Sequence, residues 1–406
     1  MRHKKFNVFL NSKILNFKKT IEVDPDKSLS IRSFLIGSIA KDISLAKNIL
    51  ESDDVKSTIA TCRKLGVKID RVAPGIYKIY GKGLGSFYAK KNSSLNFGNS
   101  GTLARLLVGI LSTTPNIKVK IHGDHSLNKR SMKSLLKLMS EFGASFFPKN
   151  KYTFPLQIIS SEIPIGIKYK AGVSAQLKSA VILAGLNSYG NTIIEEKISS
   201  RDHTENLLLN NSETIKIKKG RKKIITVFGK KELNKININI SGDPSSAAFF
   251  TALTLLNEKS FLKIKNVGLN PSRIGFYKIL KQHNANVKFE NLKKRNNELS
   301  GDIIVKSCEL KPLKTPAYLY PSTTDEYLLL FLIASFQKGV STFKGISDLA
   351  NKESSRAFQM KKILNQIGIK CTLSKDEMKI YGKGRIDASK KKIVVIIGNH
   401  FSSRMV

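Results

Sequence analysis

LGVKIDRVAPGIYKIYGKG at residues 65–83 and IGIKCTLSKDEMKIYGKG at residues 367–384 carry the pattern that decides the fold. Each stretch begins where a helical pattern ends, at Gly66 or Gly368, and continues through two short runs in which apolar and polar residues alternate. Such alternation is typical of half-buried strands. Both stretches finish at a Gly-Lys-Gly turn. The sequence therefore predicts the same helix–strand–strand arrangement at two distant places in the chain.

Weaker copies of this pattern lie between the two: FGASFFPKNKYTFPLQI (142–158) and NANVKFENLKKRNNELSGDIIVKS (284–307). A recurrence of roughly 65 to 85 residues is too long for a solenoid repeat and fits several β-α-β-α-β-β units. Apolar residues at helical spacing, most often after a Ser, Thr, Asp or Gly, predict helices at 54–65, 101–112, 130–142, 174–186, 244–257, 325–337 and 355–367. The predicted fold class is mixed α/β (α+β). Asp243 is expected to cap the helix that follows it rather than to bind a ligand.

A chain of 406 residues is too long for one hydrophobic core and suits two domains. Its net charge of +40 admits two interpretations. A strongly basic chain can bind nucleic acid. However, the lysines are spread through every segment, and the sequence contains neither a helix-turn-helix nor an RNA-recognition signature. We therefore interpret the charge as general lysine enrichment, with a local excess of cations at an anion site, and expect no nucleic-acid partner.

The three cysteines, Cys62, Cys308 and Cys371, lie far apart, show no CxxC spacing and cannot all pair, so they suggest neither a zinc site nor a disulfide framework. We expect no metal and no cofactor. No apolar run approaches the roughly 20 residues that a membrane helix needs. The basic N-terminus lacks the apolar core of a secretory signal. These features favour a cytoplasmic protein, expected to be a monomer, with no membrane partner.

Several predicted helices start at short polar loops that contain glycine. A helix start presents unpaired N–H groups and the positive end of the helix dipole, so it binds phosphate or carboxylate readily. Cations and hydroxyl groups cluster at these loops, in DKSLSIR (26–32), GNSGTLAR (98–105), GDHSLNKRSM (123–132), GVSAQLKSA (172–180) and SRDHTE (200–205). Asp325 and NKESSR (351–356) add carboxylates. The set indicates a phosphorylated substrate without defining a reaction.

These motifs, together with SGDPSSAAFF (241–250), resemble in residues and order those of the EPSP synthase (3-phosphoshikimate 1-carboxyvinyltransferase) family. The resemblance runs from about residue 20 to about residue 385. It implies a two-domain, enolpyruvyl transferase-like inverted α/β barrel made of repeated β-α-β-α-β-β units. One contiguous domain, expected at 23–236, would bind the shikimate phosphate. A split domain, expected at 1–22 plus 237–406, would carry the acid and base residues.

The resemblance also implies a reaction. The 5-hydroxyl of shikimate 3-phosphate attacks C2 of phosphoenolpyruvate while C3 is protonated, and the tetrahedral intermediate then expels phosphate. The expected catalytic residues are Lys27, which contacts both substrates, Asp325, which accepts the hydroxyl proton, and Glu353, which moves the proton at C3.

The expected substrate-binding residues fall into three groups. Ser28, Arg32, Ser174, Gln176 and Ser200 would hold the shikimate ring and its phosphate. Asn99, Gly101, Thr102 and Arg130 would line the phosphoenolpyruvate side, with Arg105 nearby. Lys352 and Arg356 would supply positive charge beside the carboxylates. His125 and His203 are expected to play no part.

Three departures from the family pattern lead us to expect a weak or inactive enzyme. Ser355 replaces an aspartate and Ser131 replaces a proline. The chain also ends in IIGNHFSSRMV (396–406), where the family continues through a further anion-binding segment. His400 and Arg404 stand near that end without an assigned role.

Three alternatives remain open at this stage. A catalytically inactive homologue could still bind shikimate 3-phosphate through the contiguous domain. A cell-wall enolpyruvyl transferase acting on a UDP-sugar would share the fold. However, such enzymes usually carry a cysteine on a mobile loop, and no cysteine lies between Arg105 and Arg130. A nucleic-acid-binding protein is the third.

Overall fold

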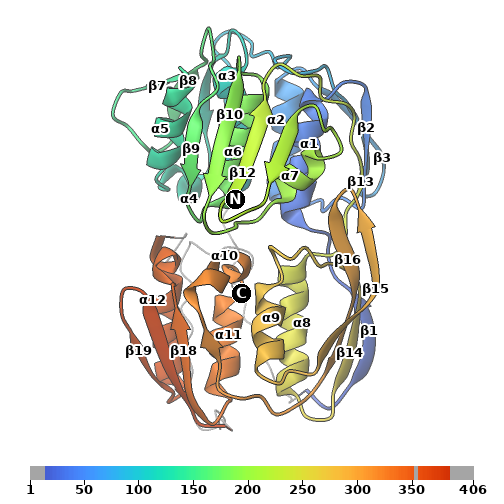
Figure 1. Cartoon of the computed structure of the whole chain (residues 1–406), viewed down its shortest axis with the longest axis vertical. Helices are drawn as coiled ribbons and strands as arrows, with labels where there is room; N and C mark the ends of the chain where they lie inside the picture. The colour runs from blue at the N-terminus through green and yellow to red at the C-terminus, as the bar shows by residue number, and fades with distance from the viewer. Residues whose placement is uncertain (1–13, 352–354, 385–406) are drawn as a thin grey trace.

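Two lobes make up the molecule, one above the other in Figure 1. The structure is a computed structural model that describes residues 14–351 and 355–384. The upper lobe runs from helix α1 to strand β13. The lower lobe combines strand β1 with the elements from helix α8 to strand β20. Each lobe has its own cluster of buried apolar side chains, within residues 29–240 and 247–380 respectively.

Five four-stranded sheets in the described ranges share one topology. In each sheet an edge strand runs parallel to its neighbour, and the other two pairings are antiparallel. This is the sheet expected for a β-α-β-α-β-β unit, so the recurrence in the sequence is confirmed as a structural repeat. Gly66 and Gly368, where two of these units leave a helix, have φ angles of +89° and +82°. Glycine adopts this left-handed conformation after a helix without steric cost.

The upper-lobe sheets are built, in spatial order, from β13 (Asn237–Asn239), β2 (Ile43–Lys47), β4 (Ile76–Tyr80) and β3 (Lys68–Ala73); β5 (Ser94–Asn96), β6 (Lys118–His122), β8 (Leu156–Ile159) and β7 (Ser145–Phe147); and β11 (Ile215–Lys218), β12 (Lys223–Phe228), β10 (Asn191–Glu196) and β9 (Lys168–Ala171). The helices of this lobe are α1 (Lys27–Ile39), α2 (Asp53–Lys64), α3 (Gly101–Thr113), α4 (His125–Asn128), α5 (Lys133–Glu141), α6 (Ala175–Leu186) and α7 (His203–Leu208).

The lower-lobe sheets are built from β1 (Lys18–Glu22), β14 (Phe261–Gly268), β16 (Glu298–Lys306) and β15 (Val287–Arg295); and β17 (Lys314–Thr315), β18 (Gly339–Lys344), β20 (Glu377–Gly382) and β19 (Lys370–Leu373). The helices and 3-10 turns are α8 (Pro244–Leu256), α9 (Gly275–Gln282), η1 (Ala317–Leu319), α10 (Tyr320–Thr323), α11 (Tyr327–Ser335), η2 (Ser347–Asn351) and α12 (Arg356–Gln366).

Two edge strands close the lobes from distant parts of the chain. β13 pairs with β2 in the upper lobe, and β1 pairs with β14 in the lower lobe. The chain therefore passes between the lobes twice, near residue 25 and near residue 242. β13 begins at Asn237, so the pairing of the upper lobe extends three residues beyond the boundary expected at 236.

Helix α1 lies in the centre of the upper lobe, and its residues from Leu29 to Ile39 are all buried. Helices α3 and α6 pack closely against each other because Gly109 of α3 leaves no side chain between the two backbones. A Cβ atom there would lie 2.5 Å from the carbonyl oxygen of Ala180. This packing fixes the starts of α3 and α6 relative to each other.

Candidate active site

The helices α1, α3 and α6 begin close together. Thr102, in the first turn of α3, accepts a hydrogen bond of 2.9 Å from Gln176 in the first turn of α6. Arg32 of α1 donates to Ser179 of α6 over 3.2 Å. Each helix start carries unpaired N–H groups and a positive dipole end. Their convergence makes this part of the upper lobe suited to anions.

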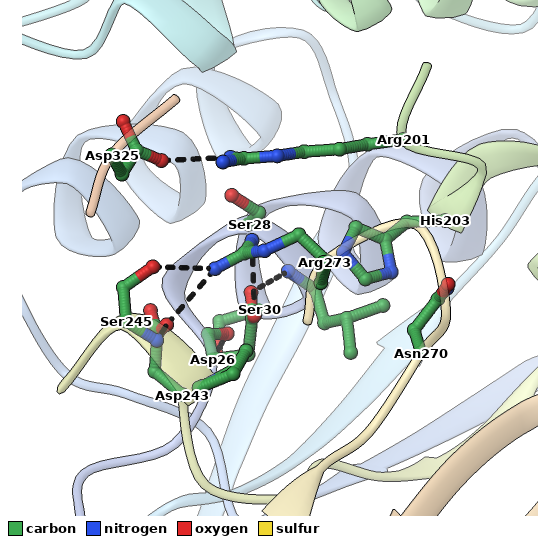
Figure 2. Close-up of polar contacts among 12 residues, drawn as sticks. Asp26, Ser28, Ser30, Arg201, His203, Asp243, Ser245, Asn270, Arg273 and Asp325 are labelled. Atoms are coloured by element: carbon green, nitrogen blue, oxygen red, sulfur yellow. Dashed lines mark hydrogen bonds and ion pairs between the residues drawn. The ribbon is translucent and has the colours of Figure 1, made fainter. Parts of the chain in front are cut away.

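Three helix starts of the lower lobe meet in the same way. Ser245 of α8 donates a hydrogen bond to Glu326, which directly precedes α11. Arg356, the first residue of α12, lies 3.5 Å from Asp325. Asp325 in turn forms an ion pair of 2.7 Å with Arg201 of the upper lobe, so the two sets of helix starts face each other across the lobe boundary (Figure 2).

Two arginines converge on the start of α3. Arg105 donates to the carbonyl of Gly101 (3.1 Å) and to Gln176 (2.9 Å). Arg130 donates to Asn99 and lies within 3.4 Å of the Ser126 hydroxyl. A Cβ atom on Gly101 would lie 2.8 Å from Nη1 of Arg105 and 3.0 Å from Nη1 of Arg130.

The structure thus brings together Asn99, Gly101, Thr102, Arg130 and Gln176, which were predicted separately from three motifs. Their contacts place two guanidinium groups over a helix start, a combination that binds carboxylate and phosphate.

Lys27 is the first residue of α1 and forms a 2.9 Å ion pair with Asp54, in the first turn of α2. The side chains of Lys27 and Asp54 are 24% and 20% exposed, so the ammonium group is reachable from solvent. Ser28 follows Lys27, and its carbonyl accepts a hydrogen bond from Arg32. Sequence reasoning did not identify Asp54 as the partner of Lys27.

Arg32 is buried and donates to Thr204 (2.9 Å) as well as to Ser179. Burial lowers the pKa of Arg32 to about 10, although Asp26 and Glu205 act in the opposite direction. In this structure the Arg32 guanidinium therefore contacts protein groups.

Ser174 and Ser200, both predicted to hold the shikimate phosphate, have different surroundings. Ser174 caps α6 by accepting from the N–H of Leu177. Ser200 is buried, and its N–H (2.7 Å) and its hydroxyl (2.6 Å) both donate to Glu196. The hydroxyl of Ser200 is thus directed into the protein here.

A buried charge network surrounds that glutamate and was missed by sequence reasoning. Lys178, fully buried, lies 2.8 Å from both Glu196 and Glu205. Burial alone would lower the pKa of Lys178, but the two carboxylates raise it above its usual value. Lys223 approaches the same carboxylates at 3.5 and 3.3 Å. The segment SRDHTE is anchored by this network.

Two further residues at the lobe boundary were also missed. Arg201 stands inside the SRDHTE motif, so its positive charge was a signal that could have been used. Arg273 lies in NPSRIGF (270–276), outside every motif that sequence reasoning selected. Lys352 and Glu353 lie outside the described residues, so their predicted roles stay predictions.

Residues 14–351 and 355–384 contain no group of three His, Cys, Asp or Glu side chains arranged to hold a metal ion. Within the same ranges, no helix combines the length and the apolar character needed to cross a membrane.

Comparison with solved structures first defines the class. The enolpyruvyl transferase NikO from Streptomyces tendae superimposes with a TM-score of 0.66 at 12% identity, covering 91% of this chain and 82% of NikO. The two proteins therefore share a fold, that of an enolpyruvyl transferase. EPSP synthase from Acinetobacter baumannii superimposes with a TM-score of 0.79 at 36% identity, covering 91% of this chain and 83% of that structure.

Sequence comparison then defines the family. The family model described as EPSP synthase (3-phosphoshikimate 1-carboxyvinyltransferase) matches residues 12–393. A 3-phosphoshikimate 1-carboxyvinyltransferase from Paramagnetospirillum magneticum is 37% identical over 90% of this chain and 82% of its own length. Its counterpart from Zymomonas mobilis is 34% identical over 95% and 85%. The chain belongs to the EPSP synthase family. These matches do not favour the alternative of an inactive homologue.

Proposed function

We propose that this protein transfers the enolpyruvyl group of phosphoenolpyruvate to the 5-hydroxyl of shikimate 3-phosphate, releasing phosphate. Family membership supports the reaction class. The observation that carries the proposal is the Arg201–Asp325 ion pair of 2.7 Å, which joins the helix starts of the two lobes. It places a carboxylate of the lower lobe beside the anion-binding groups of the upper lobe, as the reaction requires.

The charge of the substrates explains why so many cations gather here. Phosphoenolpyruvate and shikimate 3-phosphate together carry about five negative charges at neutral pH. Bringing them within reacting distance requires preorganised positive groups. Arg105 and Arg130 over the start of α3, Lys27 at the start of α1, and Arg201 between the lobes supply them.

The proposed binding roles are those that the family motifs imply. Asn99, Gly101, Thr102 and Arg130 face phosphoenolpyruvate, with Arg356 near the reacting groups. Ser28, Arg32, Ser174, Gln176 and Ser200 hold shikimate 3-phosphate, and Lys352 supplies positive charge beside the carboxylates. For Arg32 and Ser200 this role requires a change from the hydrogen bonds to Thr204 and Glu196 described above.

The proposed acid–base roles belong to two carboxylates. Asp325 accepts the proton of the 5-hydroxyl as its oxygen attacks C2 of phosphoenolpyruvate. Glu353 moves the proton added to C3 and removed again when phosphate leaves. Lys27 holds the phosphoenolpyruvate and the reacting hydroxyl together.

We also propose the division into a split domain, 1–22 with 237–406, and a contiguous domain, 23–236. The two separate apolar clusters support it, and the pairing of β13 with β2 favours a junction after Asn239. A cytoplasmic monomer is proposed as well. The three cysteines are free, as a reducing compartment would keep them. Light scattering on the purified chain tests the monomer.

Phosphate release tests the activity directly. We expect release that depends on both substrates and falls by at least about a hundredfold in Asp325→Asn, because a general base contributes roughly 10² to 10⁴ in rate. Glu232→Gln, a carboxylate in an exposed ion pair with Lys41, is the matched control and should release phosphate at the wild-type rate. Phosphate release without shikimate 3-phosphate, or none with both substrates, would contradict the proposal.

A further inference from the structure

The two chain passages between the lobes lie side by side. The N–H of Asp26 donates to the carbonyl of Ser241 (3.0 Å), and the N–H of Asp243 donates to the carbonyl of Asp24 (2.8 Å). Each passage ends in an aspartate that caps a helix. Asp26 accepts from the N–H of Leu29 at the start of α1, and Asp243 accepts from the N–H of Ser245 at the start of α8, which confirms the expected cap. One helix of each lobe therefore starts at this junction.

Arg273 connects the two caps (Figure 2). Its Nη2 atom donates to Asp243 over 3.0 Å and to the Ser245 hydroxyl over 2.8 Å, while Nη1 lies 3.4 Å from Asp26. The side chain is fully buried. A planar guanidinium can hold two carboxylates in fixed directions, which the rotating ammonium of a lysine cannot do.

The connection continues to the proposed base. The hydroxyl of Ser245 donates to Glu326, the neighbour of Asp325 in the chain. Glu326 is buried, and its burial, together with the charge of Asp325, raises the pKa of Glu326. A continuous series of contacts thus runs from the residue before Lys27, through Arg273, Ser245 and Glu326, to the residue that pairs with Arg201.

We propose that Arg273 is a positioning residue that fixes the start of α1 relative to Asp325. This inference rests on the proposed function. Lys27 and Ser28 belong to the upper lobe and Asp325 to the lower lobe, so their separation depends on how the lobes meet. A displacement of about 1 Å in such a site can cost a factor of 10² in rate. Arg273 acts through Asp26 and Ser245, and through Ser245 on Glu326.

Two variants test this role. Arg273→Lys keeps the charge and loses the fork of donors. Ser245→Ala removes the link to Glu326 and leaves every charge in place. The matched control is Arg71→Lys, because Arg71 also binds a carboxylate with two donors, at 2.8 Å each, but does so at the surface with Glu51. The readouts are kcat, KM for both substrates, and the melting temperature.

We expect kcat to fall at least tenfold in Arg273→Lys and in Ser245→Ala. KM for shikimate 3-phosphate should stay within threefold, because its expected contacts lie in the upper lobe. Arg71→Lys should keep the wild-type kcat. If Arg273→Lys does not fold, Ser245→Ala decides. A folded variant with kcat within twofold of wild type, even with a lower melting temperature, overturns the positioning role alone. Wild-type protein without phosphate release would overturn the proposed function and the inference together.

Discussion

Gly101 lies where the first turn of α3 comes within reach of two arginine side chains. The contacts that a Cβ atom would make there are with the flexible ends of Arg105 and Arg130, at 2.8 and 3.0 Å, and not with backbone. Those guanidinium groups can shift, so the protein should still fold. The shift would change the position of two cations at the predicted phosphoenolpyruvate site.

We expect Gly101→Ala to raise KM for phosphoenolpyruvate roughly tenfold, because a hydrogen bond to a charged group contributes about 1.5 to 3 kcal/mol. KM for shikimate 3-phosphate should change less than twofold. Steady-state kinetics with each substrate varied in turn measures both values. Gly220→Ala is the control, since the nearest atom to its added Cβ would be 3.8 Å away. An unchanged KM for phosphoenolpyruvate would argue against this position for the substrate.

Lys178 illustrates a charge whose removal should affect folding first. It is fully buried between Glu196 and Glu205. Lys178→Met would leave two buried carboxylates with Lys223 as the nearest cation. Removing one partner of a buried ion pair typically costs about 3 to 5 kcal/mol.

We therefore expect Lys178→Met to lower the free energy of unfolding by about that amount, measured by urea denaturation. Lys222→Met, which removes a half-exposed partner of Glu195, should cost less than about 1 kcal/mol. If both substitutions lower the free energy of unfolding by the same amount, the buried network stabilises the protein no more than the surface ion pair does.

At the scale of elements, Glu51 connects the segment between β2 and α2 with the β3–β4 hairpin. It accepts two hydrogen bonds from Arg71 (2.8 Å each), one from Tyr77 (2.7 Å) and one from the N–H of Gly75 (3.1 Å). The hydrogen bonds from Arg71, then those from Tyr77 and Gly75, lower the pKa of Glu51 to about 2. An unpaired glutamate titrates near pH 4.3.

This shift gives the contribution of Glu51 to stability a defined pH dependence. Because the pKa of Glu51 is lower in the folded protein, its contribution is complete above about pH 5 and is lost as the pH falls from about 4.3 towards 2. At pH 7 we expect the wild type to have a higher melting temperature than Glu51→Gln. The difference in stability should be about 1 kcal/mol or less, since these side chains are partly exposed. The difference in melting temperature between the wild type and Glu51→Gln should be smaller at pH 4 and smaller still at pH 3, because Glu51 becomes protonated. A constant difference would exclude this explanation.

The elements also show what periodicity can and cannot predict. The helix–strand–strand units after Gly66 and Gly368 were predicted because one face of each strand is buried and the other is solvated. The start of helix α1 was expected at DKSLSIR, but its extent to Ile39 was not predicted. It is buried on all sides, so its sequence lacks the polar face that produces a helical period. Helix α9 is short and gave too few turns for a pattern.

The candidate site divides in a similar way. Residues in motifs, such as Gly101 and Asp325, could be selected because several functional groups stand close together in the sequence. Arg273 and Asp54 could not, since their importance comes from partners 28 or more residues away in the chain or from a neighbouring helix. Contacts of this kind are set by tertiary packing and leave no local signal.

For the whole molecule, the net charge of +40 could serve to bind either nucleic acid or a small anionic substrate. The two can be distinguished by how much each ligand stabilises the folded protein. A ligand that binds only the folded state at 100 times its dissociation constant stabilises that state by about 2.7 kcal/mol. In a domain of about 200 residues, 1 kcal/mol of added stability raises the melting temperature by about 2 to 4 °C. We therefore expect shikimate 3-phosphate to raise the melting temperature by about 5 to 10 °C.

Unphosphorylated shikimate is the matched control and should raise the melting temperature much less, because it lacks the phosphate that the helix starts would bind. Double-stranded DNA should give at most a small increase that disappears at 200 mM salt, as expected for nonspecific attraction. If DNA raised the melting temperature strongly and in a salt-resistant way while shikimate 3-phosphate did not, the nucleic-acid partner would replace the proposed small anionic substrate.

The adjacent passages near Pro25 and Gly242 have a consequence for how such a protein could be rearranged. Asp24 and Asp243 are hydrogen-bonded neighbours, so the chain enters and leaves the upper lobe at a single point. In terms of gene architecture, the upper lobe is an insertion into the lower lobe. Its removal would leave two adjacent chain ends in the lower lobe that a peptide bond or a short linker could join. The same geometry makes the upper lobe a candidate for circular permutation, with its original ends connected and new ends opened in a surface turn.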